Sequence, residues 1–248
     1  MDYHFEDFTE DEYRRLIRLA KVNWEDITFG DYQKPGRVCL WRHDIDFSVH
    51  RAYRLAQIEA DEGVRSTYFI LLHGIFYNVL EKEIARLIFA IRDLGHELGL
   101  HFEPSFYGDR LRGHNALSDL LTYERQILET TFGAKIRAFS WHNPTVDDYL
   151  MTDDQDVIGG MINAYGRYIR ERYCYCSDSN GYWRFRRLRE VLEAGAEERL
   201  HILTHPEWWT PEPMSPSDRV ARCINGRTAW QYRVYQRLLE QTGRENVR

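Results

Sequence analysis

The sequence predicts an α/β fold, a single distorted (β/α)-barrel of about seven parallel strands. Two observations support this prediction. Apolar, strand-like runs alternate with helix-like segments along most of the chain, as is typical of parallel strands joined by right-handed crossovers. Several of these runs also end in an acid or a histidine, as at Asp44, His101 and His205. The carboxyl ends of barrel strands are where this architecture places metal and acid–base sites.

The first half of the chain shows the alternation most regularly. Thr9 to Glu12 has the pattern of a capping box that opens a helix. Apolar residues recur at helical spacing between Ile84 and Ile91, and Gly95 follows this stretch. We therefore predict helices over residues 9–22, 49–62, 84–94 and 117–132, and strands over residues 37–46, 66–72, 96–102 and 136–141.

The second half of the chain is less regular. No internal repeat, low-complexity tract or linker rich in Pro, Gly or Ser interrupts the sequence. We therefore expect a single domain over residues 1–248, to which the N-terminal helix is an addition. The predicted elements here are short strands over residues 157–162 and 173–176, a helix over 188–194, a strand over 200–204 and a final helix over 228–241, whose Trp230, Val234 and Leu238 share one face.

Composition and charge narrow the classes of function. The net charge of −6 argues against general nucleic-acid binding, which needs a basic surface. The acidic start lacks the features of a secretory signal, and no run approaches the roughly 20 apolar residues of a membrane span. The cysteines form no CxxC pair, which favours reduced thiols, with a zinc–thiolate site at Cys174 and Cys176 as the alternative. We expect a cytoplasmic protein without a nucleic-acid partner or a membrane span, and the sequence carries no prediction of its oligomeric state.

Asp44 and Asp46 form the strongest candidate pair. At positions i and i+2 of a strand their side chains point to the same side. Two adjacent carboxylates repel each other unless a cation lies between them or one is protonated. Arg42, at the same spacing, can neutralise part of their charge. The alternative is a strand-end turn with solvated aspartates.

The stretch from Gly95 to His101 looks like a helical zinc-protease motif but has a different spacing. Its histidines are five residues apart, which separates them by about 140° on a helix, so they would not chelate one metal. In a strand, Glu97, Gly99 and His101 share one face, and His96 lies on the other. His101 is therefore the candidate ligand, and His96 is predicted to be structural.

Other candidate site residues lie near the ends of later strands. His142 and His205 each end an apolar run and precede a proline by one or two residues, which favours extended backbone there. Asp178 lies in a polar turn, where capping is the alternative role. Four tryptophans, Trp141, Trp183, Trp208 and Trp209, are candidate walls for a sugar ring, although core packing explains any one of them equally well. A local group of arginines fits either a solvated face or a phosphate contact: Arg167, Arg170, Arg172, Arg184, Arg186, Arg187 and Arg189.

These motifs resemble the polysaccharide deacetylase superfamily (NodB homology, carbohydrate esterase 4), in particular divergent members with an RHD-x-D motif. The resemblance covers roughly Val38 to Trp209, and the motif order agrees. It implies that Asp44 is the general base and that Asp46 and His101 bind metal. It further implies that His205, in the fifth motif, is the general acid, while Asp178 and Trp183 correspond to the fourth motif.

The sequence departs from the family pattern at three places. Ile45 separates two aspartates that are adjacent in the family. Ser105 stands where the family has its second histidine ligand. Ser140, in the segment Phe139 to Pro144, stands where the family has the arginine that pairs with the base. His142 is the candidate for the missing imidazole ligand, and Glu103 is the alternative.

The resemblance implies a metal-dependent hydrolase that removes an N-acyl group, acetyl or formyl, from an amino sugar or sugar conjugate. Without an export signal, we expect a cytoplasmic glycan precursor carried on a nucleotide or a lipid. A non-catalytic carbohydrate-binding or scaffolding protein and a metal-dependent phosphoesterase are the alternatives. We expect one divalent metal, with zinc favoured, held by Asp46, His101 and His142. The expected catalytic residues are Asp44, His205 and Asp178. The expected substrate contacts are Trp141, Asn143, Trp183 and Trp208.

Overall fold

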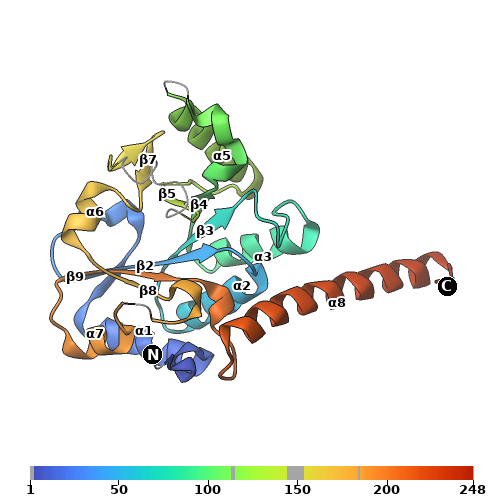
Figure 1. The fold of residues 1–248 in the computed structure, drawn as a ribbon, viewed down its shortest axis with the longest axis horizontal. Coiled ribbons are helices and arrows are strands. Elements are labelled where there is room, and N and C mark those ends of the chain that lie inside the picture. Colours follow the sequence, from blue (N-terminus) through green and yellow to red (C-terminus); the bar gives the residue numbers. More distant parts are fainter. Residues whose placement is uncertain (1–2, 113–114, 144–153, 184, 248) are drawn as a thin grey trace.

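A parallel sheet centred on strand β2 organises the molecule. The computed structural model describes residues 3–112, 115–143, 154–183 and 185–247 (Figure 1). Parallel strands run in the spatial order β7-β5-β4-β3-β2-β9-β8, which confirms the predicted α/β barrel of about seven parallel strands. These strands are β2 (Val38–Ile45), β3 (Thr67–Leu71), β4 (Glu97–Phe102), β5 (Ala138–Trp141), β7 (Met161–Asn163), β8 (Cys174–Ser177) and β9 (Arg199–Thr204).

Two short strands extend this sheet, and the barrel is open between β7 and β8. β1 (Glu25–Ile27) pairs in parallel with the first residues of β2, and β6 (Val157–Ile158) pairs antiparallel with β7. Followed in chain order, the strands pass around the barrel from β2 to β7 and then from β8 and β9 back to β2. Among the described residues no ladder joins β7 to β8, so the barrel is distorted by an opening at this place.

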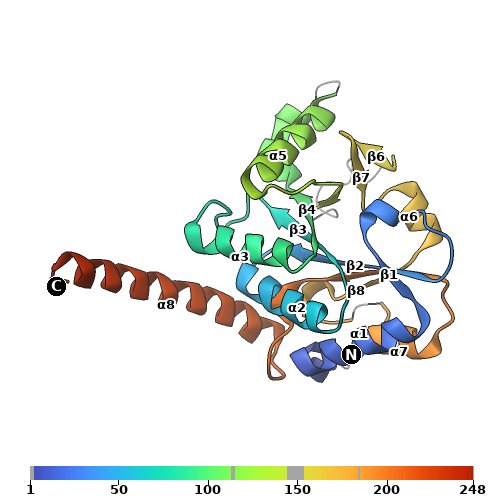
Figure 2. The ribbon, with the colours of Figure 1, turned by 180° about the vertical axis from the view of Figure 1, so that it is seen from behind.

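Helices cover the outside of the curled sheet, and α2 and α3 lie side by side (Figure 2). Half of the predicted capping box is formed: Thr9 Oγ1 accepts a hydrogen bond from the amide of Glu12 at 3.2 Å, whereas the Glu12 carboxylate binds Arg189. The helices are α1 (Glu10–Asn23), α2 (Val49–Asp61), α3 (Lys82–Asp93), α4 (Pro104–Tyr107), α5 (Ala116–Phe132), α6 (Arg167–Arg172), α7 (Leu188–Ala194) and α8 (Pro216–Thr242), with 3₁₀ turns η1 (Phe5–Phe8), η2 (Phe29–Asp31), η3 (Gly108–Arg112), η4 (Ser179–Gly181) and η5 (Pro206–Trp208).

Gly99 in β4 shows how the barrel interior constrains the sequence. Phe69 of the neighbouring strand is completely buried against this glycine. A Cβ atom at Gly99 would lie 2.6 Å from the Phe69 ring, far inside van der Waals contact. The glycine between Glu97 and His101 therefore makes room for a core aromatic ring, and the face that it shares with His101 points into the barrel.

A buried carboxylate, Glu59 of α2, links this helix to the outer face of the sheet. Its oxygens accept hydrogen bonds from the hydroxyls of Tyr13, Ser66 and Tyr68 at 2.6, 2.7 and 2.6 Å. His43 Nε2 lies 2.8 Å from the same carboxylate. Burial by itself raises the pKa of Glu59, but His43 and the hydroxyl donors outweigh it and lower the pKa to about 2. The group is therefore a carboxylate that four side chains satisfy.

The structure differs from the sequence prediction at two elements. The single strand predicted over residues 157–162 is a hairpin, because Gly159 and Gly160 both adopt positive φ and reverse the chain. The final helix begins at Pro216, twelve positions before the predicted start at residue 228. In the structure α8 runs away from the barrel (Figure 1), and Val234 and Leu238 remain 38% and 54% exposed. The predicted apolar face therefore does not pack on the barrel core.

The first half of α8 is anchored to the rest of the molecule, and Arg227 near its middle pairs with Glu81. Arg219 is completely buried and donates to the carbonyl oxygens of Gly181 and Phe5. Within the described part of the chain, no helix combines the length and apolar character needed to cross a membrane.

Replacing Glu59 by glutamine is expected to destabilise the fold by about 3 kcal/mol at pH 7, because the amide cannot satisfy the same set of donors. Since the folded-state pKa of about 2 lies below the ordinary value of 4.5, the carboxylate stabilises the protein above pH 4.5 and loses this effect as the pH falls toward 2. Urea unfolding of the wild type and Glu59→Gln at pH 7 and pH 3 measures both effects.

Asp61→Asn on the same helix is the matched control, because its ion pair with Arg14 is at the surface and contributes little. Equal stability of the Glu59 and Asp61 variants at pH 7 would contradict the structural role of Glu59.

Candidate metal and acid–base site

The carboxyl ends of the central strands carry the candidate site residues to one end of the barrel. Two cavities meet there, of about 370 and 470 Å³. Both are lined by Asp46, His142 and His205, and the smaller cavity is also lined by Asp44 and His101. The structure thus brings together the predicted base, acid and metal ligands, which lie far apart in the sequence.

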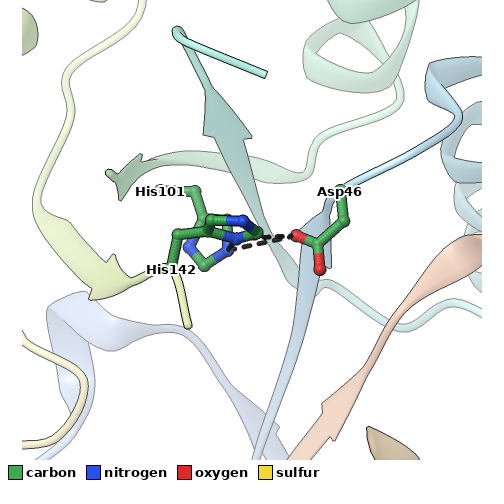
Figure 3. Close-up of side chains that lie close together, drawn as sticks. All are labelled: Asp46, His101 and His142. Carbon is green, nitrogen blue, oxygen red and sulfur yellow. Dashed lines mark hydrogen bonds and ion pairs between the residues drawn. The ribbon is translucent and has the colours of Figure 1, made fainter. Parts of the chain in front are cut away.

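Three donor atoms converge between β2, β4 and β5 (Figure 3). His101 Nε2 lies 3.1 Å from Asp46 Oδ1, His142 Nδ1 lies 3.5 Å from the same oxygen, and the two nitrogens are 3.1 Å apart. Ligand atoms at about 2.0–2.1 Å from a tetrahedral zinc ion are separated by about 3.3–3.4 Å. The three atoms therefore have the spacing of three corners of one coordination tetrahedron.

The environment of Asp46 also fits a cation. Its Oδ1 atom is buried and has no hydrogen-bond partner of good geometry among the described residues, although the two imidazole nitrogens are close. Close atoms with poor mutual direction are expected when all three point at a common position. Burial alone raises the pKa of Asp46, but His101 and His142 outweigh this effect and lower it, so the aspartate is ionised.

Further side chains orient the two imidazoles. His101 Nδ1 lies 2.7 Å from Ser140 Oγ, which leaves Nε2 facing Asp46. His142 Nε2 lies 3.3 Å from Glu103 Oε2, on the side of the ring away from Asp46. A carboxylate in this position fixes the tautomer of a metal-binding histidine. Glu103 therefore lies behind His142, and the alternative in which Glu103 itself completes the donor set is not supported by this arrangement.

Asp44 is buried deeper in the barrel, with only 2% of its surface exposed. Ser140 Oγ lies 3.2 Å from Asp44 Oδ1, and Arg42 Nη2 lies 3.3 Å from Oδ2. Arg42 is completely buried and also donates to the hydroxyl of Tyr165 at 2.7 Å. The guanidinium beside Asp44 thus comes from the same strand as the aspartate, and the hydroxyl contact comes from β5.

His205 forms a pair with Asp178 at the ends of β9 and β8. His205 Nδ1 lies 2.7 Å from Asp178 Oδ1, and the Trp209 indole donates to Asp178 Oδ2 at 2.9 Å. Burial by itself lowers the pKa of His205, but Asp178 outweighs burial and raises the pKa to about 10. The imidazole is therefore protonated at neutral pH, and its Nε2 lies 3.9 Å from Asp46 Oδ2.

Three of the predicted substrate-binding residues line the two cavities, and the fourth lies elsewhere. Asn143 lines both cavities, Trp141 lines the smaller one and Trp208 the larger one. Trp183 is not among the residues that line these cavities, because its ring stacks on Phe8 at 5.1 Å in the N-terminal part of the core. The structure therefore gives no support to Trp183 as a substrate contact.

The predicted arginine group is explained by ion pairs with carboxylates. Arg187 and Arg189 bind Asp7 and Glu12 of the N-terminal segment, and Arg186 binds Glu197. Arg167 and Arg170 share Asp154, Arg172 lies over the ring of Tyr168, and Arg184 lies outside the described residues. The solvated alternative therefore fits these side chains better than a phosphate contact.

Two features of the site were missed by sequence reasoning. Ser140, noted only as a departure from the family, connects Asp44 to His101. Glu59 contacts His43 Nε2, and His43 Nδ1 lies 2.8 Å from the hydroxyl of Thr204, the residue that precedes His205 in the chain. No motif marks Glu59, because its partners come from distant parts of the chain.

The fold and the site define an open α/β barrel with a candidate metal centre at its carboxyl end. A scan of protein-family models finds no match for this chain, and neither does a search of the curated proteins. Solved structures do match. A family 4 acetyl xylan esterase from Clostridium thermocellum, in complex with a cobalt ion, has 14% identity and a TM-score of 0.45, with 84% of this chain and 92% of that chain covered.

Two other solved structures show a comparable likeness. The catalytic domain of a peptidoglycan N-acetylglucosamine deacetylase from Eubacterium rectale has 13% identity and a TM-score of 0.45, with 79% and 86% of the two chains covered. A CE4 family pseudoenzyme from Bacillus anthracis has 14% identity and a TM-score of 0.42, and this chain spans only 61% of its length. Two of these three structures are named as members of carbohydrate esterase family 4, and the likeness is one of fold.

The purified protein is expected to bind one zinc ion per chain through the three converging atoms. Asp46→Asn and His142→Ala should weaken zinc binding at least about 100-fold, and Glu103→Gln about 10–100-fold through the orientation of His142. Titration with a competing chelator measures these affinities. His4→Ala is the matched control, and unchanged zinc affinity in His142→Ala would contradict its place in the donor set.

Proposed function

We propose that this protein is a metal-dependent hydrolase that removes an acetyl or formyl group from the nitrogen of an amino sugar or sugar conjugate. The observation that carries the proposal is the placement of a carboxylate, Asp44, and a protonated imidazole, His205, around one set of converging donor atoms. The motif order, with Asp44 and Asp46 first and His205 last, supports the substrate class.

Asp46, His101 and His142 would hold the dication, and two imidazoles with one carboxylate favour zinc. When bound, the metal would lower the pKa of water toward about 7 and polarise the acyl carbonyl. Ser140 and Glu103 would keep the two imidazoles in the tautomers that this task needs.

In this proposal Asp44 acts as the general base. Its carboxylate would take a proton from water as the oxygen attacks the acyl carbon. The guanidinium of Arg42 and the hydroxyl of Ser140 each hold one carboxylate oxygen, so the orientation of the base is fixed before substrate binds.

In this proposal His205 acts as the general acid. As the C–N bond breaks, its Nε2 proton would pass to the leaving nitrogen, so that an amine and a carboxylic acid are released. Asp178 accepts from the opposite ring nitrogen and stabilises the imidazolium. Asp178 is thus a positioning residue for the acid.

Asn143, Trp141 and Trp208, which line the two cavities, are the candidate substrate contacts. Because the cavities extend on both sides of Asp46, His142 and His205, the reacting group can lie at their junction while the rest of the substrate extends into either one. A cytoplasmic glycan precursor remains our proposed substrate.

Acyl release from N-acetyl- and N-formyl-amino sugars tests this function. The zinc-loaded protein is expected to release acetate or formate, and Asp44→Asn and His205→Ala should each lower kcat by about 10²–10⁴-fold. Asp31→Asn, an exposed carboxylate outside the site, is the control. A protein that binds zinc and amino sugars but releases no acid would instead be a non-catalytic carbohydrate-binding protein.

The pH profile tests the pairing of His205 with Asp178. Because Asp178 raises the pKa of His205, the imidazole stays protonated at neutral pH and loses its proton only as the pH rises toward 10. Asp178→Asn should move the alkaline limb of kcat/KM toward the ordinary histidine value of 6.5. Wild type and variant are compared with the same metal, and superimposable alkaline limbs would refute the pairing.

A further inference from the structure

A separate cavity lies between the barrel and one face of α8. It has a volume of about 290 Å³. Residues after β2 and β3, among them Phe47 and Phe76, form one wall, and residues 222–233 of α8 form the other. None of the metal donors lines this cavity, and the proposed chemistry assigns it no role.

Glu207 is a buried side chain on the wall of this cavity. It is 1% exposed, and neither carboxyl oxygen has a hydrogen-bond partner on another described residue. Burial and the nearby charge of Asp46 raise its pKa well above the ordinary value. A neutral carboxyl group can both donate and accept, and an unsatisfied buried one costs free energy until a ligand supplies the partner.

The same cavity is lined by four arginines. Arg51 and Arg227 form ion pairs with Glu10 and Glu81. Arg222 and Arg233 have no carboxylate partner among the described residues. Two guanidinium groups on one helix face, without a counterion in the described part of the chain and in a protein of net charge −6, favour an anionic ligand with several oxygen atoms.

The cavity adjoins the proposed reaction site. Phe47 and Phe76 stack at a centroid distance of 4.0 Å and line both this cavity and the 470 Å³ cavity that contains His205. A third hollow of about 510 Å³ shares the same two rings and also reaches Arg227. A ligand can therefore extend from the reaction site across the two rings to the arginines of α8.

We propose that this cavity binds the phosphate-bearing carrier of the substrate, with Arg222 and Arg233 on the phosphate and Glu207 on a hydroxyl group of the ligand. The inference rests on the proposed function, because it places the N-acyl amino sugar beside His205 and its phosphorylated carrier beyond Phe47 and Phe76. A nucleoside diphosphate and a lipid phosphate share the chemistry that this site recognises.

Calorimetric titration of the full zinc-loaded chain tests the proposal with three probes: inorganic pyrophosphate, uridine diphosphate and decyl phosphate. The wild type is expected to bind at least one organic phosphate. The double variant Arg222→Gln/Arg233→Gln should bind it about 100-fold more weakly, at about tenfold per guanidinium. Arg237→Gln/Arg244→Gln, with the same charge change outside the cavity, should bind like the wild type. Preference for uridine diphosphate or for decyl phosphate identifies the carrier as nucleotide or lipid.

Two results would overturn the assignment. A wild type that binds none of the probes has no phosphate site, and equal affinity in the Arg222/Arg233 variant places the phosphate elsewhere, for instance on zinc. Calorimetry needs no turnover, so the two proposals are separable. A chain that releases acyl groups but binds no probe refutes this inference alone, and one that binds a probe through these arginines but releases no acid refutes the proposed function.

Discussion

The buried charge of Asp44 is the constraint on which the arrangement of the site depends. A carboxylate inside a barrel is unfavourable unless opposite charge and hydrogen-bond donors surround it. Arg42 meets this need from two positions earlier on β2, where the pleat directs both side chains to the same side. Arg42 is itself completely buried and donates to Tyr165, and both Asp44 and Tyr165 line the smaller cavity together with the three metal donors.

Ser140 connects Asp44 to one of the metal donors. Its hydroxyl contacts Asp44 on one side and His101 Nδ1 on the other, so the orientations of these two side chains are coupled. The serine therefore has a structural role of its own. Asp44 receives its opposite charge from β2, through Arg42, and its hydroxyl contact from β5, through Ser140.

Much of the site was predictable, because strand periodicity and position at strand ends are local properties of a sequence. Asp44, Asp46 and His101 follow from them, and His142 from its place on the next strand. Glu59 and Glu207 were not predictable, since their burial depends on elements far apart in the chain. The positions of Trp183 and of the arginines between Arg167 and Arg189 were not predictable for the same reason. Composition does not reveal in which part of the core a ring packs or with which carboxylate a guanidinium pairs. The early start of α8 was missed because the apolar pattern begins well after its cap at Ser215.

The three converging donors come from β2, β4 and β5, and β3 lies between the first two of these strands. A dication at this position would link β2 to the paired strands β4 and β5, with which β2 shares no hydrogen-bond ladder, across the carboxyl end of an incompletely closed barrel. Ligation would also tie residues 46, 101 and 142 into two covalent loops through the ion, so part of the binding free energy would be folding free energy. Metal occupancy would then set the thermal stability of the open barrel as well as its chemistry.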